Sequence, residues 1–243
     1  MAFWYDCAVT ESRCPYLFVP RLNAVRGLVH GFGGARWSEA DFLAFAEAKG
    51  TKPVIMRQLH SDVVHRVDAA PGRKLEGDAL MTDVPGLLLV IRTADCLPVL
   101  IVDTENRAAA AVHCGWRGTQ KRILEKAIRA MSEAYGSKPD ECVAALGPCI
   151  GAACYEVGGE VRKAFLEAAF PERLFCGAPG RERKFLLDLR EANLWLLREL
   201  GFRKAHVFNA GPVCTHCEPG LLSYRRHSAD PRRMYNFVGF GID

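Results

Sequence analysis

Two apolar runs that follow each other closely are the strongest constraint on the fold of this chain. Residues 97–102 and 108–112 have the length and composition of buried strands, and the polar segment 103–107 between them is short enough for a hairpin turn. Antiparallel pairing would bring the end of the second run back to the start of the first. Cys96 precedes the first run and His113 follows the second, so the hairpin predicts that these two side chains are neighbours.

The remaining pattern mixes helices with short strands. Helical apolar spacing, bounded by a capping residue or a glycine, predicts helices over residues 38–49, 119–136, 159–169 and 189–200. Strands are expected at 28–32, 53–57, 87–91, 142–146, 185–187, 204–209 and 235–242. The glycine-rich segment 30–34 predicts a turn, 58–65 an extended chain, and 171–183 a loop that could act as a lid. No repeat or linker divides the chain, so we expect one domain over residues 1–243.

Composition excludes several classes of protein. The net charge of +4 is small and the basic residues are dispersed, which disfavours a nucleic-acid-binding protein. The longest apolar run is interrupted by Arg92 and is too short to span a membrane, and the first residues do not resemble a signal peptide. We therefore expect a cytoplasmic protein whose ten cysteines are mainly reduced thiols, and a monomer or weak homodimer acting on a small molecule.

The chemistry of the side chains predicts a zinc site. Catalytic zinc takes three protein ligands of imidazole or thiolate type and keeps a fourth position open, and His60, Cys96 and His113 would supply such a set. The expected metal is Zn²⁺, although copper could occupy the same ligands in vitro. A multicopper oxidase needs many histidines, typically in H-x-H pairs, and this chain has seven histidines without one such pair. We therefore reject oxidase chemistry as the main function.

Other polar residues are candidates for substrate binding. Arg117 lies where a strand meets a helix, a position suited to binding an anion. Cys149 lies in a glycine-rich turn before a helix, and Arg225 lies in a basic segment near the C-terminus. The Cys214-Thr-His-Cys217 segment lacks the second pair of ligands that a structural zinc site needs, so we do not predict a metal there.

Several motifs, in the same order along the chain, resemble the YfiH or laccase-domain family, also labelled multicopper polyphenol oxidase and purine nucleoside phosphorylase/adenosine deaminase. The motifs are Gln58-Leu-His-Ser61, Gly77-Asp78-Ala-Leu-Met-Thr82, Thr93-Ala-Asp-Cys-Leu-Pro98, Val112-His-Cys-Gly-Trp-Arg-Gly118, Gly147-Pro-Cys-Ile-Gly151, Tyr155-Glu-Val157 and Ser223-Tyr-Arg-Arg226. The resemblance implies a four-layer α/β/β/α fold of the α+β class with mixed sheets, similar to a toxin deamidase that uses a Cys-His pair. It also implies zinc on His60, Cys96 and His113 and substrate contacts from motif residues such as Asp78 and Tyr155.

The resemblance implies phosphorolysis of adenosine, inosine, guanosine and methylthioadenosine, together with adenosine deamination. In deamination, a water activated by the metal attacks C6 of adenine, and Asp95 or Asp62 is a candidate proton carrier. In phosphorolysis, Arg117 or Arg225 would hold the attacking phosphate.

Two alternatives stay open. One is a metal-free Cys96–His113 amidase that edits peptidoglycan precursors, with an oxyanion hole around residues 147–151. The other is a protein that binds metal without catalysis.

Overall fold

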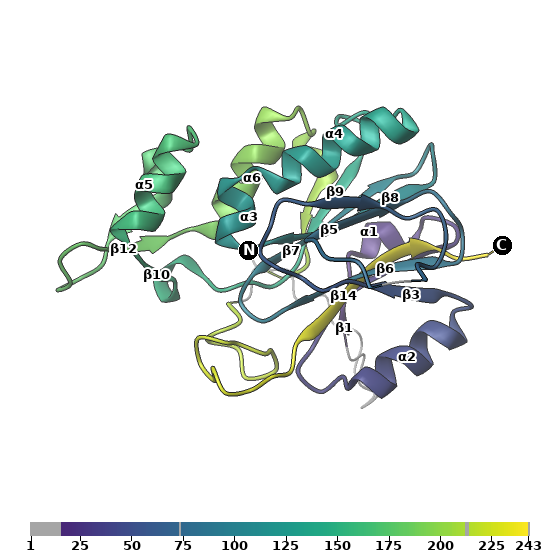
Figure 1. Cartoon of the computed structure of the whole chain (residues 1–243), viewed down its shortest axis with the longest axis horizontal. Coiled ribbons are helices and arrows are strands. Elements are labelled where there is room, and N and C mark those ends of the chain that lie inside the picture. Colours follow the sequence, from purple (N-terminus) through teal and green to yellow (C-terminus); the bar gives the residue numbers. More distant parts are fainter. Residues whose placement is uncertain (1–15, 73, 212–213, 243) are drawn as a thin grey trace.

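The computed structural model describes residues 16–72, 74–211 and 214–242 and arranges them in four layers (Figure 1). Helix α2 (Glu39–Ala48) covers the outer face of a five-stranded sheet, and a six-stranded sheet packs against the inner face. Helices α3 (Trp116–Gln120), α4 (Ile123–Tyr135) and α6 (Leu189–Glu199) lie on the far side of the second sheet. The α+β class and the α/β/β/α layering are confirmed.

The five-stranded sheet has the strand order β1-β2-β14-β6-β3. Its strands are β1 (Tyr16–Leu17), β2 (Leu28–Gly33), β14 (Met234–Phe240), β6 (Leu87–Thr93) and β3 (Lys52–Ile55), and the short helix α1 (Pro20–Asn23) connects β1 to β2. Neighbouring strands are antiparallel except β3 and β6, which are parallel. The last strand in the sequence, β14, lies in the middle, so the C-terminal segment is part of the core of this layer.

The six-stranded sheet has the order β13-β9-β7-β8-β5-β4 and contains the expected hairpin. Its strands are β13 (Val207–Asn209), β9 (Val143–Leu146), β7 (Leu97–Asp103), β8 (Ala108–Cys114), β5 (Ala79–Thr82) and β4 (Val64–Arg66). Strands β7 and β8 pair antiparallel, with Leu97 opposite Cys114 and Pro98 opposite His113. This register confirms that Cys96 and His113 lie at the same end of the hairpin.

Strand β7 is apolar up to its last residue, Asp103, because both of its faces are covered. Leu97, Val99 and Ile101 pack into the core shared with the helices. Leu100 and Val102 point the other way and pack into the core between the two sheets. A strand buried on both sides needs an unbroken apolar run, since no position faces water.

A small third sheet, β10-β12-β11, lies beside helix α5 (Gly159–Glu167). Its strands are β10 (Glu156–Gly158), β12 (Lys184–Leu187) and β11 (Phe175–Gly177). The expectation of a loop over residues 171–183 is therefore wrong in part, because a 3₁₀ turn at Glu172–Leu174 leads into β11. Phe175 is buried and pairs with Leu187, which fixes this part of the segment in place.

The helices begin and end mostly where their capping residues predict. In α2, the Ser38 hydroxyl accepts from Asp41 N while the Asp41 carboxylate accepts from Ser38 N, which satisfies two free amides at the helix start. The single helix expected over 119–136 is instead two helices, because Arg122 adopts a left-handed backbone (φ 61°) between α3 and α4. Residues Lys204–His206 form a 3₁₀ turn before β13, where a strand was expected. None of the helices in the described ranges is long and apolar enough to cross a membrane.

Gly31 and Gly33 belong to strand β2, although a turn was expected over residues 30–34. A Cβ atom on Gly31 would lie 2.7 Å from Phe237 Cζ, and one on Gly33 would lie 2.8 Å from the Tyr235 carbonyl oxygen. Both distances are shorter than any normal contact. Glycine is therefore required here by the close approach of β14 and, at Gly31, also of Tyr16 on β1.

His30 on β2 makes the stability of this fold depend on pH. The ring is 4% exposed, its Nε2 accepts a hydrogen bond from Val19 N at 3.1 Å, and burial lowers its pKa from 6.5 to about 4. Between these two values the unfolded chain binds a proton that the folded chain does not. We expect stability to fall as the pH drops from about 6.5 through 4, by up to about 3 kcal/mol from this group.

Denaturant unfolding of His30→Gln against the parent across this pH range tests the prediction. Glutamine keeps an acceptor for Val19 N and does not titrate, so the difference in unfolding free energy between the two proteins should shrink or reverse as the pH falls. A difference that is constant with pH would contradict the assignment.

Candidate metal centre

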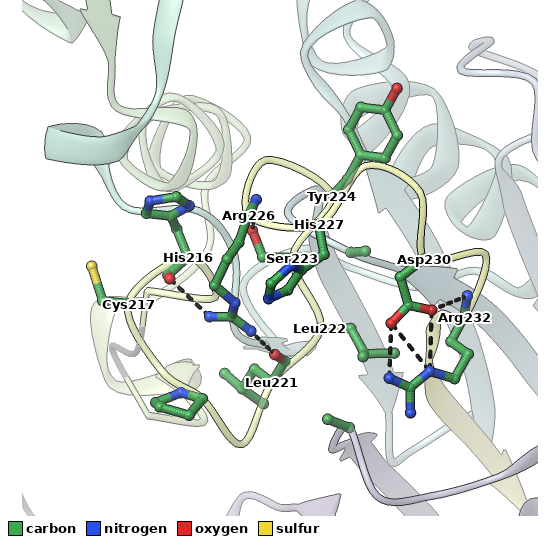
Figure 2. Close-up of a pocket in the computed structure, with 13 residues that line it drawn as sticks. His216, Cys217, Leu221, Leu222, Ser223, Tyr224, Arg226, His227, Asp230 and Arg232 are labelled. Carbon is green, nitrogen blue, oxygen red and sulfur yellow. Dashed lines mark hydrogen bonds and ion pairs between the residues drawn. The ribbon is translucent and has the colours of Figure 1, made fainter.

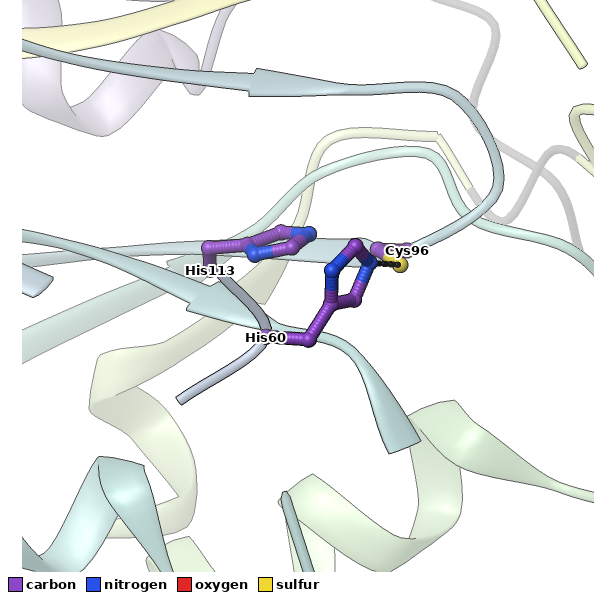
Figure 3. A group of neighbouring side chains, drawn as sticks. All are labelled: His60, Cys96 and His113. Atoms are coloured by element: carbon purple, nitrogen blue, oxygen red, sulfur yellow. Dashed lines mark hydrogen bonds between the residues drawn. The ribbon is translucent and has the colours of Figure 1, made fainter. Parts of the chain in front are cut away.

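Three side chains from separate parts of the chain meet at one end of the β7–β8 hairpin (Figure 3). Cys96 lies in the short connection by which the chain crosses from β6 in one sheet to β7 in the other. His113 lies near the end of β8, and His60 lies in the loop between β3 and β4. The ligand atoms of the three residues all lie within 4.8 Å of one another. The structure therefore brings together the three residues predicted to hold a metal.

The group is closed on one side and open on the other. His113 is only 3% exposed, Cys96 is half-buried and His60 is exposed. Cys96 Sγ lies 3.9 Å from His60 Nε2, and the two imidazole rings meet edge to face with centroids 5.0 Å apart. A ligand bound to these atoms would therefore have protein behind it and solvent on the His60 side.

Asp78 fixes the positions of both histidines. This carboxylate, from the residue just before β5, is fully buried. Its Oδ1 accepts from His113 Nδ1 at 2.8 Å and from His60 N at 3.0 Å. Because Nδ1 of His113 donates to a carboxylate, its Nε2 is the nitrogen left free to bind a metal.

The other oxygen of Asp78 holds the loop that carries His60. Oδ2 accepts from the amides of Leu59 (3.2 Å) and Ser61 (2.6 Å) and from the Ser61 hydroxyl (2.6 Å). Three consecutive amides thus converge on one carboxylate, and His60 adopts a left-handed backbone (φ 56°). The expected extended chain over residues 58–65 is therefore wrong at this point. Such a backbone is unfavourable for a non-glycine residue, and the contacts to Asp78 stabilise it.

The metal-free group carries separated charges. Burial alone would raise the pKa of Cys96, but the positive charge of His113 and hydrogen bonds from His113 and His60 lower it to about 6. Burial alone would lower the pKa of His113, but the Cys96 thiolate and Asp78 raise it to about 9. Near neutral pH, Cys96 is therefore a thiolate beside an imidazolium, and its sulfur is already in the form that binds metals.

The donor set fits a zinc ion. It offers one thiolate and two imidazoles, which is a ligand combination of catalytic zinc sites, with an open side for a fourth ligand. The Asp78–His113 hydrogen bond is the carboxylate–histidine contact that usually accompanies a metal-bound imidazole. A bivalent cation would replace the proton on His113 as the positive charge beside Cys96.

Gly115, just after His113 and Cys114, is needed for the ligands to approach one another. A Cβ atom here would lie 3.1 Å from Cys96 Sγ, 3.1 Å from His60 Cδ2 and 3.7 Å from His113 Cε1. Its backbone (φ −71°, ψ 164°) suits any residue, so the requirement is one of space. Sequence reasoning missed this residue, although it stands inside the motif that contains His113.

We expect Gly115→Ala to weaken metal binding by about 10- to 100-fold, as changes next to metal ligands usually do, with little loss of fold stability. Competition with a coloured chelator measures the affinity. Gly177→Ala is the control, because a Cβ atom at Gly177 meets nothing within 4 Å. Equal affinity in both variants would show that the space at Gly115 is irrelevant to the site.

Asp95, which precedes Cys96, has both carboxylate oxygens occupied. Oδ1 accepts from the Thr215 hydroxyl at 2.6 Å and Oδ2 from Arg225 N at 2.7 Å, and the residue is 8% exposed. Its backbone is left-handed (φ 85°). These two contacts tie the Asp95 carboxylate to Thr215 and Arg225 near the C-terminus. Asp62, the other predicted carrier, forms ion pairs with Lys126 and Lys121.

Two predicted arginines interact electrostatically with a predicted tyrosine, as Cys96 does. Burial raises the pKa of Tyr155, the charges on Cys96 and Asp95 raise it further, and those on Arg225 and Arg117 lower it. Such effects fall off over about 10 Å, so these residues surround one region. Arg225 lies over the Tyr155 ring (5.7 Å) and donates to the Glu156 carbonyl, while Arg117 stacks on Trp116 (4.4 Å).

Cys149 is placed differently from the other predicted residues. It is 1% exposed, Arg190 donates to its sulfur at 3.5 Å, and burial raises its pKa to about 11. Its thiol is therefore neutral and covered by protein.

A cavity of about 380 Å³ lies among residues near the C-terminus (Figure 2). The segment 216–232 forms most of its wall, and Ala94, two residues before Cys96, lines it from the other side. Arg226 holds this segment in shape by donating to the carbonyls of Thr215, His216, Glu218 and Leu221. None of the three metal-binding side chains lines this cavity.

Comparison with known proteins decides the family. A family model described as multi-copper polyphenol oxidoreductase laccase matches residues 39–241. The chain belongs to this laccase family. Among its curated relatives, the purine nucleoside phosphorylase of Deinococcus radiodurans is 39% identical over 185 residues, covering 76% of this chain and 68% of the relative. The purine nucleoside phosphorylase YfiH of Escherichia coli is 33% identical over 189 residues, covering 77% of this chain and 74% of the relative.

Solved structures of the laccase family share the fold. YlmD from Geobacillus stearothermophilus superimposes with a TM-score of 0.83 at 25% identity, covering 96% of this chain and 98% of that one. The resemblance seen in the motifs to the YfiH or laccase-domain family is thus confirmed. The names of the curated relatives support an enzyme that acts on a small molecule.

Proposed function

We propose that this protein is a zinc-dependent purine nucleoside enzyme that catalyses phosphorolysis of adenosine, inosine, guanosine and methylthioadenosine, and deamination of adenosine. The observation that carries the proposal is the preformed group of His60, Cys96 and His113, which is open to solvent at His60. Arg117 and Arg225 act electrostatically on Tyr155, as Cys96 does. The names of the curated relatives supply the substrate class. We also propose that it acts in the cytoplasm on substrates of low molecular mass.

Each residue of the site has a role in this proposal. His60, Cys96 and His113 hold the metal, and Asp78 keeps His113 in the tautomer whose Nε2 faces it. A bound Zn²⁺ ion would supply Lewis acidity and lower the pKa of water in its open position. Asp78 also fixes the loop of His60, so that both imidazoles keep their positions while substrate enters from the exposed side.

The arginines suit the phosphate of the phosphorolysis reaction. Arg117 and Arg225 both act on Tyr155 electrostatically, so their charges reach the same region as Cys96. In phosphorolysis, phosphate attacks C1′ of the ribose through a transition state with cationic character, and the two guanidinium groups would hold that phosphate. The Tyr155 ring, half-buried below Arg225, offers a flat surface for the nucleoside.

Zinc agrees better than copper with these donors. A multicopper oxidase needs a blue copper site and a trinuclear cluster rich in histidine. Within the described residues, the one group that contains histidine has two imidazoles and a thiolate. We therefore propose zinc chemistry and no oxidase activity, although the family is described as a laccase family.

A Cys-His amidase is the second candidate, and one observation favours it. The Cys96 thiolate lies beside the His113 imidazolium, and the Asp78 carboxylate orients that imidazolium. This is the nucleophile, base and orienting group of a cysteine-based catalytic triad. The expected oxyanion hole disagrees with the structure, because three amides of that segment already donate elsewhere. Gly147 N binds the Pro98 carbonyl, Ile150 N the Asp95 carbonyl and Gly151 N the Cys214 sulfur.

A substrate panel with controlled metal content separates the candidates. The protein is purified, stripped with a chelator and reloaded with zinc, and each form is tested on adenosine and inosine with phosphate and on a serine-bearing muropeptide precursor. The proposal predicts nucleoside turnover that disappears on stripping and returns with zinc. Full activity of the stripped protein would refute the zinc mechanism. Muropeptide cleavage that survives stripping and is lost on alkylation would establish the amidase, and metal binding without turnover would establish a non-catalytic protein.

A further inference from the structure

A second group of potential metal ligands shares no residue with the first. The sulfur atoms of Cys154, Cys214 and Cys217 are all within 4.8 Å of one another. Cys154 ends a 3₁₀ turn (Ala152–Cys154), while the other two cysteines lie more than fifty residues later in the chain. The Cys154 and Cys217 sulfurs are 3.4 Å apart. From the sequence we expected no metal at the Cys214–Cys217 pair because further ligands were lacking, and the fold supplies one from a distant segment.

Backbone contacts hold these three thiols together. Gly151 N donates to Cys214 Sγ at 3.1 Å, and Cys149 and Cys214 form a short parallel bridge between the two segments. A Cβ atom on Gly151 would lie 3.2 Å from Cys214 Cβ and 3.3 Å from Cys214 Sγ, so a side chain here would crowd Cys214. Amides that point at sulfur stabilise the thiolate form, which is the form that binds metals.

The segment that carries Cys214 and Cys217 is also ordered in advance. The amides of Cys217 and Glu218 both donate to the Cys214 carbonyl, which makes a tight turn with the two sulfurs on one side. Arg226 donates to four carbonyls of the same segment, and Figure 2 shows the bonds to His216 and Leu221. Binding would therefore order little of the chain, and the exposed side chain of Cys217 leaves the group open to an entering ion.

We propose that Cys154, Cys214 and Cys217 form a second metal site, which binds a soft cation such as Zn²⁺ through three thiolates and leaves a fourth position for solvent. Thiolate ligands favour zinc and monovalent copper over hard cations such as Mg²⁺ or Ca²⁺. On binding, each of the three sulfurs that carries a proton releases it to solvent, and no bond is oxidised or reduced.

Metal binding at this second site would stabilise the segments that pack beside the first metal site. Thr215, next to Cys214, donates to the Asp95 carboxylate, and Asp95 precedes Cys96. Ile150, a few residues before Cys154, also contacts Asp95, through its backbone amide. An ion bound to Cys154 and the 214–217 turn would therefore fix two segments that contact Asp95, the residue before the ligand Cys96. We expect the second ion to stabilise the protein without contacting substrate.

Metal counting in matched variants tests the proposal independently of the activity. Protein purified with a reductant and loaded with zinc should hold two ions per chain, and Cys217→Ser and Cys154→Ser should each hold one. Cys96→Ala should also hold one, and Cys96→Ala combined with Cys217→Ser should hold none. Cys176→Ser is the control, because Cys176 is an exposed free cysteine outside both groups; it should hold two.

Two further readouts cover variants that fold poorly. In the Cys96→Ala background, cobalt should give a thiolate charge-transfer absorption that Cys217→Ser abolishes, and zinc should raise Tm by several degrees only when Cys217 is present. Equal zinc content in the wild type and Cys217→Ser would overturn the proposal. So would a Cys154–Cys217 disulfide in the reduced, zinc-loaded protein, because the sulfurs would then be unavailable.

Discussion

Replacing Cys96 with alanine is expected to remove one metal ion per chain and to lower nucleoside turnover by about a thousandfold or more. Without the thiolate, two imidazoles remain, one of which is exposed, and they hold zinc weakly. A catalytic metal contributes several kcal/mol to the transition state, and each 1.36 kcal/mol is a factor of ten in rate. The prediction is checked by metal analysis and steady-state kinetics on the same preparation.

Cys176→Ala is the matched control for this experiment, since Cys176 is an exposed cysteine outside the metal-binding groups. It should keep both the metal and the activity. Cys96→Ala should still fold. The Cys96 side chain is half-buried and contacts the two histidines of the site, so its loss removes little apolar packing from the core. If Cys96→Ala kept the parent's metal content and activity, the assignment of this thiolate as a ligand would be wrong.

Replacing Asp78 with asparagine is expected to damage both the fold and the metal site. The carboxylate is fully buried and accepts hydrogen bonds from three amides, one hydroxyl and one imidazole. An amide side chain has one acceptor oxygen, so its NH₂ group would face donors and leave them unsatisfied. Breaking a buried charged network of this kind costs about 3–5 kcal/mol, and loss of the histidine's partner costs about 10- to 100-fold in metal affinity.

The control is Asp103→Asn, because Asp103, the last residue of β7, is also a buried carboxylate and accepts from the amides of Glu105 and Asn106 in the turn that follows. Both variants should unfold at lower denaturant concentration than the parent. Only Asp78→Asn should also bind zinc more weakly, as measured by chelator competition at a temperature where both are folded. Equal zinc affinity in the two variants would show that Asp78 does not orient the ligands.

Local patterns were enough to predict much of the fold. Strand β7 is an unbroken apolar run because both of its faces are buried, and its hairpin with β8 has the register that the short turn implies. Helix α2 begins at Ser38, whose side chain caps it, and helix α6 begins at Asp188 for the same reason. These features depend on neighbours within a few residues, and the sequence displays such neighbours directly.

The missed features depend on contacts between distant segments. The left-handed backbone of His60 exists because Asp78, on another segment, binds three consecutive amides. Gly31 and Gly33 stay in strand β2 because Phe237 and Tyr235 of β14 approach closely. Cys154 joins Cys214 and Cys217 only after the chain has folded. Spacing along the sequence contains no information about these encounters. Ligand chemistry alone proposed His60 together with Cys96 and His113, and the resemblance to a family implied the same three residues.

X-ray absorption at the zinc edge tests the central claim most directly, in a Cys154→Ser/Cys217→Ser variant that retains the His60, Cys96 and His113 ligands. We predict a first shell of one sulfur at about 2.3 Å and nitrogen or oxygen atoms at about 2.0–2.1 Å, in a four-coordinate site with one position held by solvent. The sulfur signal should vanish when Cys96→Ala is added. A shell without sulfur, or one that is unchanged by Cys96→Ala, would contradict the proposed site.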